Sequence, residues 1–567
     1  MPHQLTNRDF PKFNSSLSKS QEIFALTFVL LGGLIVAAPL FEFVVTAVGL
    51  PLPQPLLIGV GAVWVGYGLL LLALRRLSEG LFVGFLVAST FSADVPLTST
   101  ANLFPGHTVG TAVMYYGPLA GLVGLAALYR WNTAELPLAV YTLGAFVGAT
   151  VLSALFGGGP STGVALWFSL FALAGFFAYF MTILAIRETA VSFADALRVF
   201  CIVVGAQALV GMVQFLRGAP FGLWELGEAN RHVVETLSLP IVGSLPLGTH
   251  VSGFTGMAFQ LAFLLVLIAP LAIVLYLRVG GWRQVLSLGI LLLIVLLVRG
   301  SSSDAARGAF LGALVAFTIL SLAVWVSEMS SSETSPSSLL SNIGAKFAAG
   351  CSMVALLLYP SSAAGDVSSQ PVDQPTPTDP QEPTPPSDTE TPSAGGSGGG
   401  DPELQSSWLV EQVETINSLS IPLFDLSNLG TRLVQYIAAI DVFLQYPLVG
   451  LGGMNFVLVG QQYGVTSPPY TELTYPIHSI YFTLLAETGL LGFSLFVLTV
   501  GLIFFYGYQA AQMQTTNSDI PLALLAGMSG ALAYMLLDVF LLTNAASWAQ
   551  FWIVGGLVTI SYQQASR

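Results

Sequence analysis

Charged residues are scarce in this sequence. Asp, Glu, Lys and Arg together make up 8% of its 567 residues, whereas a soluble globular protein carries about 25%. Most of the chain therefore has no water to face, which argues against a set of soluble domains. Hydrophobic residues reach 54% and form continuous runs of about 20 residues, the length of a helix that crosses a bilayer. Because these runs do not alternate with polar residues, β-barrel strands are excluded as well.

Cysteine and lysine are also rare. The two cysteines, Cys201 and Cys351, lie in apolar runs, so the sequence predicts neither a disulfide framework nor a zinc site built on cysteine. Only three lysines, Lys12, Lys19 and Lys346, stand against 30 acidic residues. The resulting net charge of −13 suggests a salt-adapted source, and so few basic residues form no patch that would bind nucleic acid.

The apolar runs recur along nearly the whole chain and predict an all-α, polytopic integral membrane protein with about 12–14 transmembrane helices. A polar segment at residues 1–21 precedes the first run. It has no small-residue cleavage site, so we expect a cytoplasmic tail and a retained helix rather than a removed signal peptide. The runs expected to span the membrane are Ile23–Val48, Leu56–Leu74, Leu81–Leu97, Val109–Leu128, Leu136–Phe156, Gly163–Ile186, Ala194–Phe215, Phe254–Leu277, Val285–Val298, Ala309–Val326, Phe347–Leu358, Ile480–Tyr506, Ile520–Leu542 and Trp548–Ser561.

Composition divides the rest of the chain into four regions. Residues 22–360 and 478–567 contain the transmembrane helices. Between them, residues 361–400 are rich in Pro, Thr, Ser and Gly and cannot bury enough apolar surface to fold, so we expect a disordered linker. Residues 401–477 regain apolar periodicity in "GTRLVQYIAAIDVFLQYPLVGLGG", which predicts a folded loop with an amphipathic helix that ends near Pro447.

Basic residues in the short loops indicate the orientation, because cytoplasmic loops are enriched in Lys and Arg. With the N-terminus inside, both termini are cytoplasmic, and the loop 361–477 is extracytoplasmic, on the outer side of the cell membrane. The cytoplasmic loops then receive Arg75, Arg76, Arg130, Arg187, Arg278, Arg283 and Lys346. Five arginines remain on the outer side and need a separate explanation: Arg217, Arg231, Arg299, Arg307 and Arg432.

Two basic side chains and one acid stand out around the end of the large loop. Arg432 is the only basic residue in residues 361–477, where an ion pair with an acidic neighbour is an equally simple interpretation. His478 opens the apolar run "HSIYFTLLAETGLLGF", where a structural role is more common than a catalytic one. Glu487 lies about 13.5 Å deeper along a helix, where a carboxylate costs about 3 kcal/mol or more. We interpret Glu487 as a neutral acid in a helix-packing hydrogen bond rather than as a proton relay.

A second basic group lies in the segment "VRGSSSDAARGAFLGALVAF", which places Arg299 and Arg307 around a polar turn between two apolar runs. Asp304 stands three residues before Arg307, so a local ion pair is the simplest interpretation. Arginine is also the residue that holds phosphate in a bidentate manner. Two outer arginines at one membrane level, together with Arg432, therefore form a candidate site for a lipid diphosphate.

These segments, in this order, resemble the O-antigen ligase family, which groups lipopolysaccharide O-antigen ligases (WaaL), Wzy-type polymerases and PglL-type protein O-oligosaccharyltransferases. The resemblance covers roughly residues 253–505. It rests on "GFTGMAFQLAFLLVLIAPLAI", "AARGAFLGALVAF", "TRLVQYIAAIDVFLQYPLVGLGGMNF" and "HSIYFTLLAETGLLGF", and on the large loop between them.

Three positions match family motifs. Arg307 matches the arginine of the family's "SRG" helix start, Arg432 the loop arginine before "PLxGxG", and His478 the histidine of "HNxYLxxxxExGxxG". The sequence departs from the family at three places, with Ala306 for the usual Ser, Ser479 for the usual Asn, and Met257-Ala258 for the usual Pro-Asn.

The resemblance implies a GT-C-like membrane glycosyltransferase of polysaccharide biosynthesis in a prokaryotic cell envelope, with a ligase-like core from about residue 253. It would move a glycan from a polyprenyl-diphosphate-linked donor to a hydroxyl of a glycan, lipid or protein acceptor at the outer face of the membrane. Neither a metal nor a cofactor is expected, and the displacement would invert the sugar carbon. A Wzy-type repeat-unit polymerase needs the same chemistry and stays open. In a different class, the alternative is a polytopic transporter or flippase.

Elementary chemistry suggests a role for each residue. A leaving diphosphate needs cations, which Arg432 and Arg307 supply, with Arg299 as a further candidate. An ordinary histidine is mostly neutral near pH 7 and accepts a hydroxyl proton, so His478 is the expected general base. The acidic pairs of the linker look like solvating charge rather than metal ligands. Two residues of an outer loop are candidates to line an acceptor groove, although a solvated loop face is the simpler interpretation: Arg231 and His250.

Overall fold

The computed structural model describes most of the chain. The described residues are 18–48, 55–74, 76–92, 136–188, 191–223, 226, 228–229, 233–239, 243–249, 251–301, 303–329, 344, 350, 353, 429–460, 476–514, 518–538 and 544–567. Several expected features lie outside them, namely most of the N-terminal tail, the spans at 109–128 and 347–358 apart from single positions of the second, the linker 361–400, residues 401–428 of the large loop, and Arg231 and His250.

Helices dominate the described elements. In chain order the elements are α1 (Lys19–Gly32), η1 (Gly33–Ala37), α2 (Ala38–Val48), α3 (Pro55–Leu74), α4 (Leu77–Ala88), α6 (Leu138–Phe156), α7 (Thr162–Glu188), α8 (Phe193–Arg217), β1 (Val233–Leu239), β2 (Gly243–Thr249), α9 (Ala258–Arg278), α10 (Trp282–Gly300), α11 (Asp304–Met329), α14 (Leu429–Gln445), α15 (Phe456–Val459), α16 (Ile480–Met513), α17 (Asp519–Leu537) and α19 (Ala545–Ala565).

Nine helices of the described residues are long and apolar enough to cross a membrane. They are the continuous stretch Ser20–Val48, formed by α1, η1 and α2, and the helices α6, α7, α8, α9, α10, α11, α16 and α17. Two shorter apolar helices, in α3 and α4, add to them. The chain is therefore a multi-pass helical membrane protein, and the total of 12–14 spans stays a prediction.

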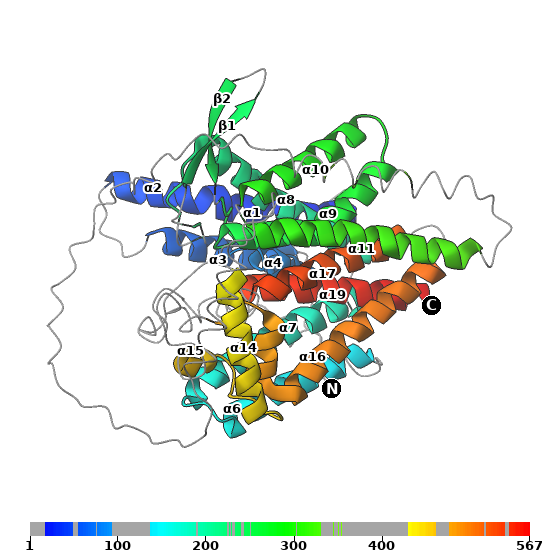
Figure 1. Cartoon of the computed structure of the whole chain (residues 1–567). Helices are drawn as coiled ribbons and strands as arrows, with labels where there is room; N and C mark the ends of the chain where they lie inside the picture. The colour runs from blue at the N-terminus through cyan, green and yellow to red at the C-terminus, as the bar shows by residue number, and fades with distance from the viewer. Residues whose placement is uncertain are drawn as a thin grey trace, which may run out of the picture.

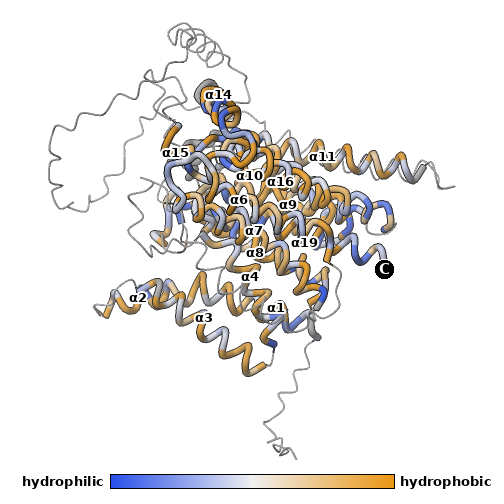
Figure 2. Tube along the Cα trace, turned by 90° about the horizontal axis from the view of Figure 1, so that it is seen from below, coloured by the Kyte–Doolittle hydropathy of each residue, from blue (hydrophilic) through white to orange (hydrophobic). Residues whose placement is uncertain are grey.

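The long helices run side by side, and α14 lies crosswise at one end of them (Figure 1). At this end, which we call the α14 end, Ser303 before α11 and Tyr534 near the end of α17 share a hydrogen bond of 2.9 Å. At the opposite end, Arg278 of α9 and Asp519 of α17 form an ion pair at 3.4 Å. Figure 2 shows mainly hydrophobic helices whose hydrophilic segments gather largely at helix ends, as expected for a bundle that spans a bilayer.

A β-hairpin between α8 and α9 differs from the sequence-based expectation of an outer loop there. β1 pairs with β2 in antiparallel register, from Val233 opposite Thr249 to Leu239 opposite Gly243. The hairpin supplies the only strands among the residues that the structure describes. Alternation in a seven-residue strand is a much weaker signal than a membrane-spanning run, so the loop was the simpler prediction.

The predicted amphipathic helix of the large loop is present as α14, Leu429–Gln445. Its buried face carries Val434, Ala438 and Val442, none more than 4% exposed. Two larger apolar residues of the helix, Ile440 and Leu444, lie off that face and are 41% and 68% exposed. α14 packs against α16, and its buried face includes the small side chains of Ala438 and Ala439.

Helix α16 is broken at Gly489, where the backbone has φ 65° and ψ −169°. The break frees backbone groups of residues 486–491 from helical hydrogen bonds, and the loop segment 447–452 after α14 pairs with them. Four hydrogen bonds form this contact, which we call the clasp: Leu451 N–H to the Ala486 carbonyl at 3.0 Å, Gly452 N–H to the Glu487 carbonyl at 2.8 Å, Leu490 N–H to the Pro447 carbonyl at 2.8 Å, and Leu491 N–H to the Leu448 carbonyl at 3.2 Å. Within a membrane an unpaired backbone group costs several kcal/mol, so the clasp makes the break tolerable.

Glycine is required on both sides of the clasp. Gly450 has φ 69°, and a Cβ there would overlap the backbone of Glu487. A Cβ on Gly489 would overlap the Leu448 carbonyl. The two backbones therefore approach too closely for any side chain, and both positions also need a left-handed conformation that other residues rarely adopt.

Substitution of either glycine tests the clasp. Gly450→Ala and Gly489→Ala should each lower the free energy of unfolding by about 1–3 kcal/mol, because each adds backbone strain and an overlap. The measurement is the thermal unfolding midpoint of the purified chain in detergent. Gly501→Ala, in the same helix but with no atom within 4 Å of its added Cβ, is the matched control and should leave stability equal or higher. Equal midpoints for Gly489→Ala and Gly501→Ala would contradict the clasp.

Candidate functional site

Helix α14 presents three polar side chains toward the ends of α16 and α17. Arg432, Gln435 and Tyr436 are spaced so that they share one helix face. The Tyr436 hydroxyl donates to the carbonyl of His478 at 2.9 Å and to that of Leu536 at 3.1 Å. Its ring stacks on Phe482 with centroids 4.5 Å apart. Tyr436 therefore fastens α14 to the start of α16 and to the end of α17, which fixes where Arg432 lies.

His478, two residues before α16, is held by Gln435. The Gln435 side-chain oxygen accepts the His478 backbone N–H at 2.9 Å and lies 2.8 Å from the ring atom Nδ1. A backbone N–H only donates, so this end of the amide is the oxygen. The Nδ1 atom must then carry the hydrogen, and in the neutral ring the lone pair resides on Nε2. The predicted base thus has a defined tautomer.

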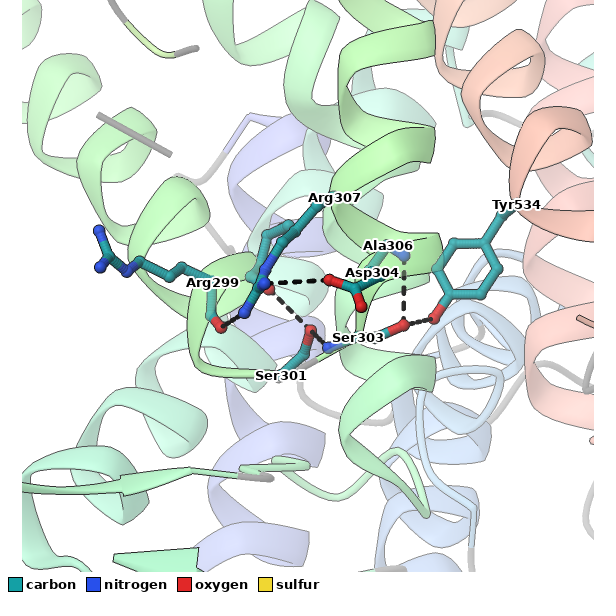
Figure 3. Close-up of polar contacts among 8 residues, drawn as sticks. Arg299, Ser301, Ser303, Asp304, Ala306, Arg307 and Tyr534 are labelled. Carbon is teal, nitrogen blue, oxygen red and sulfur yellow. Dashed lines mark hydrogen bonds and ion pairs between the residues drawn. The ribbon is translucent and has the colours of Figure 1, made fainter. Parts of the chain in front are cut away.

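Arg307 lies in the first turn of α11 (Figure 3). Its Nη1 atom donates to Asp304 Oδ1 at 3.0 Å, so the expected local ion pair is present. Nη2 lies 3.5 Å from the Arg299 carbonyl oxygen, at the limit of a hydrogen bond. The Nε atom is buried and has no hydrogen-bond partner among the described residues. Within the described residues, the edge formed by Nε and Nη2 therefore makes weaker hydrogen bonds than Nη1 does.

Arg299 does not join Arg307 through its side chain. Its carbonyl faces the Arg307 guanidinium, while its own guanidinium extends away from Asp304 and Ser303 (Figure 3). The polar turn brings both arginines to the α14 end of the bundle, but their side chains point in different directions (Figure 3). Arg299 is thus the weaker candidate for a shared anion site.

Tyr534, which is fully buried, links the start of α11 to α14. Its hydroxyl lies 2.9 Å from Ser303 Oγ, and the Ser303 carbonyl accepts the Arg307 backbone N–H at 3.1 Å. Arg432 and Asp538 both act electrostatically on this hydroxyl. Tyr534 is therefore connected to both predicted arginines, to Arg307 through Ser303 and to Arg432 through its charge.

The same two charges act on Tyr436. Burial raises the pKa of its hydroxyl to about 12, while the nearby Arg432 lowers the pKa and Asp538 raises it. Tyr436 is therefore a neutral hydrogen-bond donor at physiological pH. Asp538, directly after α17, acts on the same hydroxyl as Arg432. An ion pair of Arg432 with an acid of the large loop stays a prediction, because most of these acids lie outside the described residues.

Glu487, which is 1% exposed, anchors the loop after the clasp. One carboxylate oxygen accepts the Met454 N–H at 2.7 Å and the other accepts the Phe456 N–H at 3.2 Å. Met454 is the only non-glycine residue with positive φ, 59°, in the described part of the chain. Ser153 Oγ of α6 donates to the Glu487 carbonyl at 2.6 Å. The sequence predicted a neutral acid in a hydrogen bond between packed helices. The printed partners of the Glu487 side chain are instead backbone N–H groups, of Met454 in the loop and of Phe456 at the start of α15.

The described residues hold no group of three or more His, Cys, Asp or Glu side chains that could bind a metal ion. The charged side chains described at the α14 end include Arg299, Arg307, Arg432, Asp304 and Asp538. A scan against protein-family models gives no match, and no similar sequence is found among curated proteins. The function is consequently argued from the site itself.

Four residues that shape the site were not predicted. Gln435 and Tyr436 stand three and four positions after Arg432, and helical spacing could have identified them. Ser303 and Tyr534 are 231 residues apart in sequence, and no local pattern signals their contact.

Replacement of Glu487 tests its role as an anchor. In Glu487→Ala two backbone donors lose their acceptor, and each unpaired buried donor costs about 1–3 kcal/mol. Glu487→Gln, which keeps one acceptor oxygen, should cost less. Thermal unfolding of the purified chain in detergent measures both losses. Asp441→Asn is the control, because Asp441 on α14 is exposed. An unchanged midpoint for Glu487→Ala would rule out the anchoring role.

Proposed function

We propose that this protein is a GT-C-like membrane glycosyltransferase of the O-antigen ligase type. It moves a glycan from a polyprenyl-diphosphate-linked donor to an acceptor hydroxyl at the outer face of the cell membrane. The observation that supports the proposal is that the segments carrying Arg307, Arg432 and His478 are tied together at the α14 end by contacts of Tyr534, Tyr436 and Gln435. The three residues come from three separate segments of the chain, and the α14 end is taken as the outer end.

The two arginines stabilise the leaving group in this proposal. As the bond between the sugar carbon and the diphosphate breaks, negative charge grows on the diphosphate oxygens. The Nε and Nη2 atoms of Arg307 form an edge that suits bidentate contact with phosphate oxygens. Arg432, which lies on α14, supplies a second guanidinium group. Guanidinium groups carry their charge at every physiological pH, so neutralisation of the diphosphate by this route needs no metal ion.

His478 activates the acceptor. Its Nε2 lone pair takes the proton of the acceptor hydroxyl while the hydroxyl oxygen attacks the anomeric carbon. The carbon–oxygen bond to the diphosphate breaks in the same displacement, which inverts the anomeric carbon. Polyprenyl diphosphate leaves as an anion beside the arginines, and the proton on Nε2 passes to water. A repeat-unit polymerase would use the same groups, with the growing glycan as acceptor.

The geometry favours this chemistry over proton-coupled transport through Glu487. Both oxygens of the Glu487 carboxylate accept backbone N–H groups, and the side chain serves a loop. A relay group would have to release these bonds during each transport cycle.

Substitution of the three residues tests the proposal. Arg307→Ala, Arg432→Ala and His478→Ala should each reduce transfer about 100-fold or more, because each removes charge stabilisation or base catalysis. The assay follows glycan transfer from a lipid-linked donor by the purified protein in liposomes. Arg283→Ala is the control, because Arg283 is exposed in the first turn of α10, at the opposite end of the bundle. Full transfer by His478→Ala would overturn the proposal, and uptake that survives in His478→Ala but fails in Glu487→Ala would indicate a transporter instead.

A further inference from the structure

The strongest further feature of the site is the buried side chain of Gln435. It is 0% exposed and stands one helical turn after Arg432. Its oxygen receives two hydrogens from one residue, the backbone N–H and the Nδ1–H of His478. A neutral amide in this position is notable, because a carboxylate would bind an imidazole N–H more strongly.

We infer that Gln435 is the positioning residue of the general base: it locks His478 in the Nδ1–H tautomer and directs Nε2 toward the acceptor. The catalytic role of Gln435 rests on the proposed function, whereas the tautomer of His478 can be measured without any reaction. Two hydrogen bonds to one oxygen hold both the backbone and the ring of His478, so the ring cannot turn over without breaking a bond to a buried group.

The spacing to Arg432 explains why the partner is an amide. A glutamate at position 435 would stand three residues after Arg432, where opposite charges on a helix pair with each other. That pairing would draw the guanidinium away from a diphosphate. Gln435 therefore orients the base without competing for the cation that holds the donor.

The elements at this end of the bundle carry other titratable and charged groups besides His478. Arg432 and Tyr436 come from α14, Tyr481 from the first turn of α16, and Tyr534 and Asp538 from α17 and its end. These groups are the same in every variant proposed below, so a change in the pH profile upon substitution of Gln435 reports on the Nδ1 contact.

Two substitutions should shift the acid limb of the pH–rate profile in opposite directions. In Gln435→Glu the carboxylate stabilises the imidazolium and raises the pKa of His478, so the limb should move to higher pH by about one unit or more. The KM for the lipid-linked donor should also rise, because the new carboxylate pairs with Arg432. In Gln435→Leu the imidazolium loses an acceptor, so the limb should move to lower pH, with a plateau rate lower by about 10- to 100-fold.

Gln207→Leu is the matched control for a purely structural effect. Gln207 is also buried, at 1% exposed, and its side-chain oxygen accepts the Phe254 backbone N–H at 2.9 Å across a similar separation in sequence. Its loss should lower the thermal unfolding midpoint as Gln435→Leu does, but it should leave the acid limb where it is in the wild type. An acid limb that is the same in Gln435→Glu, Gln435→Leu and Gln207→Leu would overturn the inference.

Nitrogen-15 NMR of histidine-labelled protein provides a readout that is independent of catalysis. The chain has five histidines, and the His478 signals are assigned by their loss in His478→Ala. Above the pKa, the wild type should show a protonated Nδ1 and a bare Nε2, and Gln435→Leu should gain the Nε2–H tautomer. If Nε2–H already dominates in the wild type, the inference fails even if the proposed function holds. If His478→Ala retains transfer, the proposed function fails while the measured tautomer still stands.

Discussion

The backbone pairing between the segment after α14 and the break in α16 is the constraint on which the rest of the site depends. A helix interrupted inside a bilayer exposes amide and carbonyl groups that lipid cannot satisfy. The clasp supplies four hydrogen bonds to these groups, and only glycine at positions 450 and 489 allows the backbones to approach closely enough. Because the clasp joins the end of α14 to the middle of α16, it also sets the register between them. In that register Gln435 contacts His478, and Arg432 lies about one helical turn before Gln435 on α14.

The packing behind the clasp makes the site part of a rigid frame rather than of a free loop. The Glu487 side chain accepts the backbone N–H groups of Met454 and Phe456. The turn between α6 and α7 contacts the same loop, because the Gly159 N–H donates to the Leu451 carbonyl at 2.8 Å. Each of these bonds is made by a group in or beside a membrane-spanning helix. Precise placement of reacting groups needs such support, since a displacement of about 1 Å can cost about 100-fold in rate.

The sequence predicted the helices, which follow from the local periodicity of apolar residues. It missed the features that depend on close contact between segments far apart in the chain. Apolar runs identified α9, α11 and α17, and the apolar pattern before Pro447 identified α14. The face of α14 was less predictable, because small side chains such as Ala438 are buried while the larger Ile440 and Leu444 are exposed. The break at Gly489 was missed altogether, since "ETGLLGF" is also a normal sequence for a continuous apolar helix. The sequence ranked Arg299 below Arg307, as a further candidate, but it could not show that the two side chains point in different directions from the turn between α10 and α11 (Figure 3).

The ion pair of Arg307 with Asp304 looks at first like an argument against a role in binding, because it occupies the guanidinium. The contact uses Nη1 alone and fixes the plane of the group. Fixing that plane presents Nε and Nη2 in a single orientation, and Nε is a buried donor without a partner in the described part of the chain. Such a donor costs about 1–3 kcal/mol while it stays unpaired. Under the proposed function, an anionic oxygen that reached this edge would remove that cost as it bound, so the ion pair with Asp304 is compatible with a ligand on the Nε side.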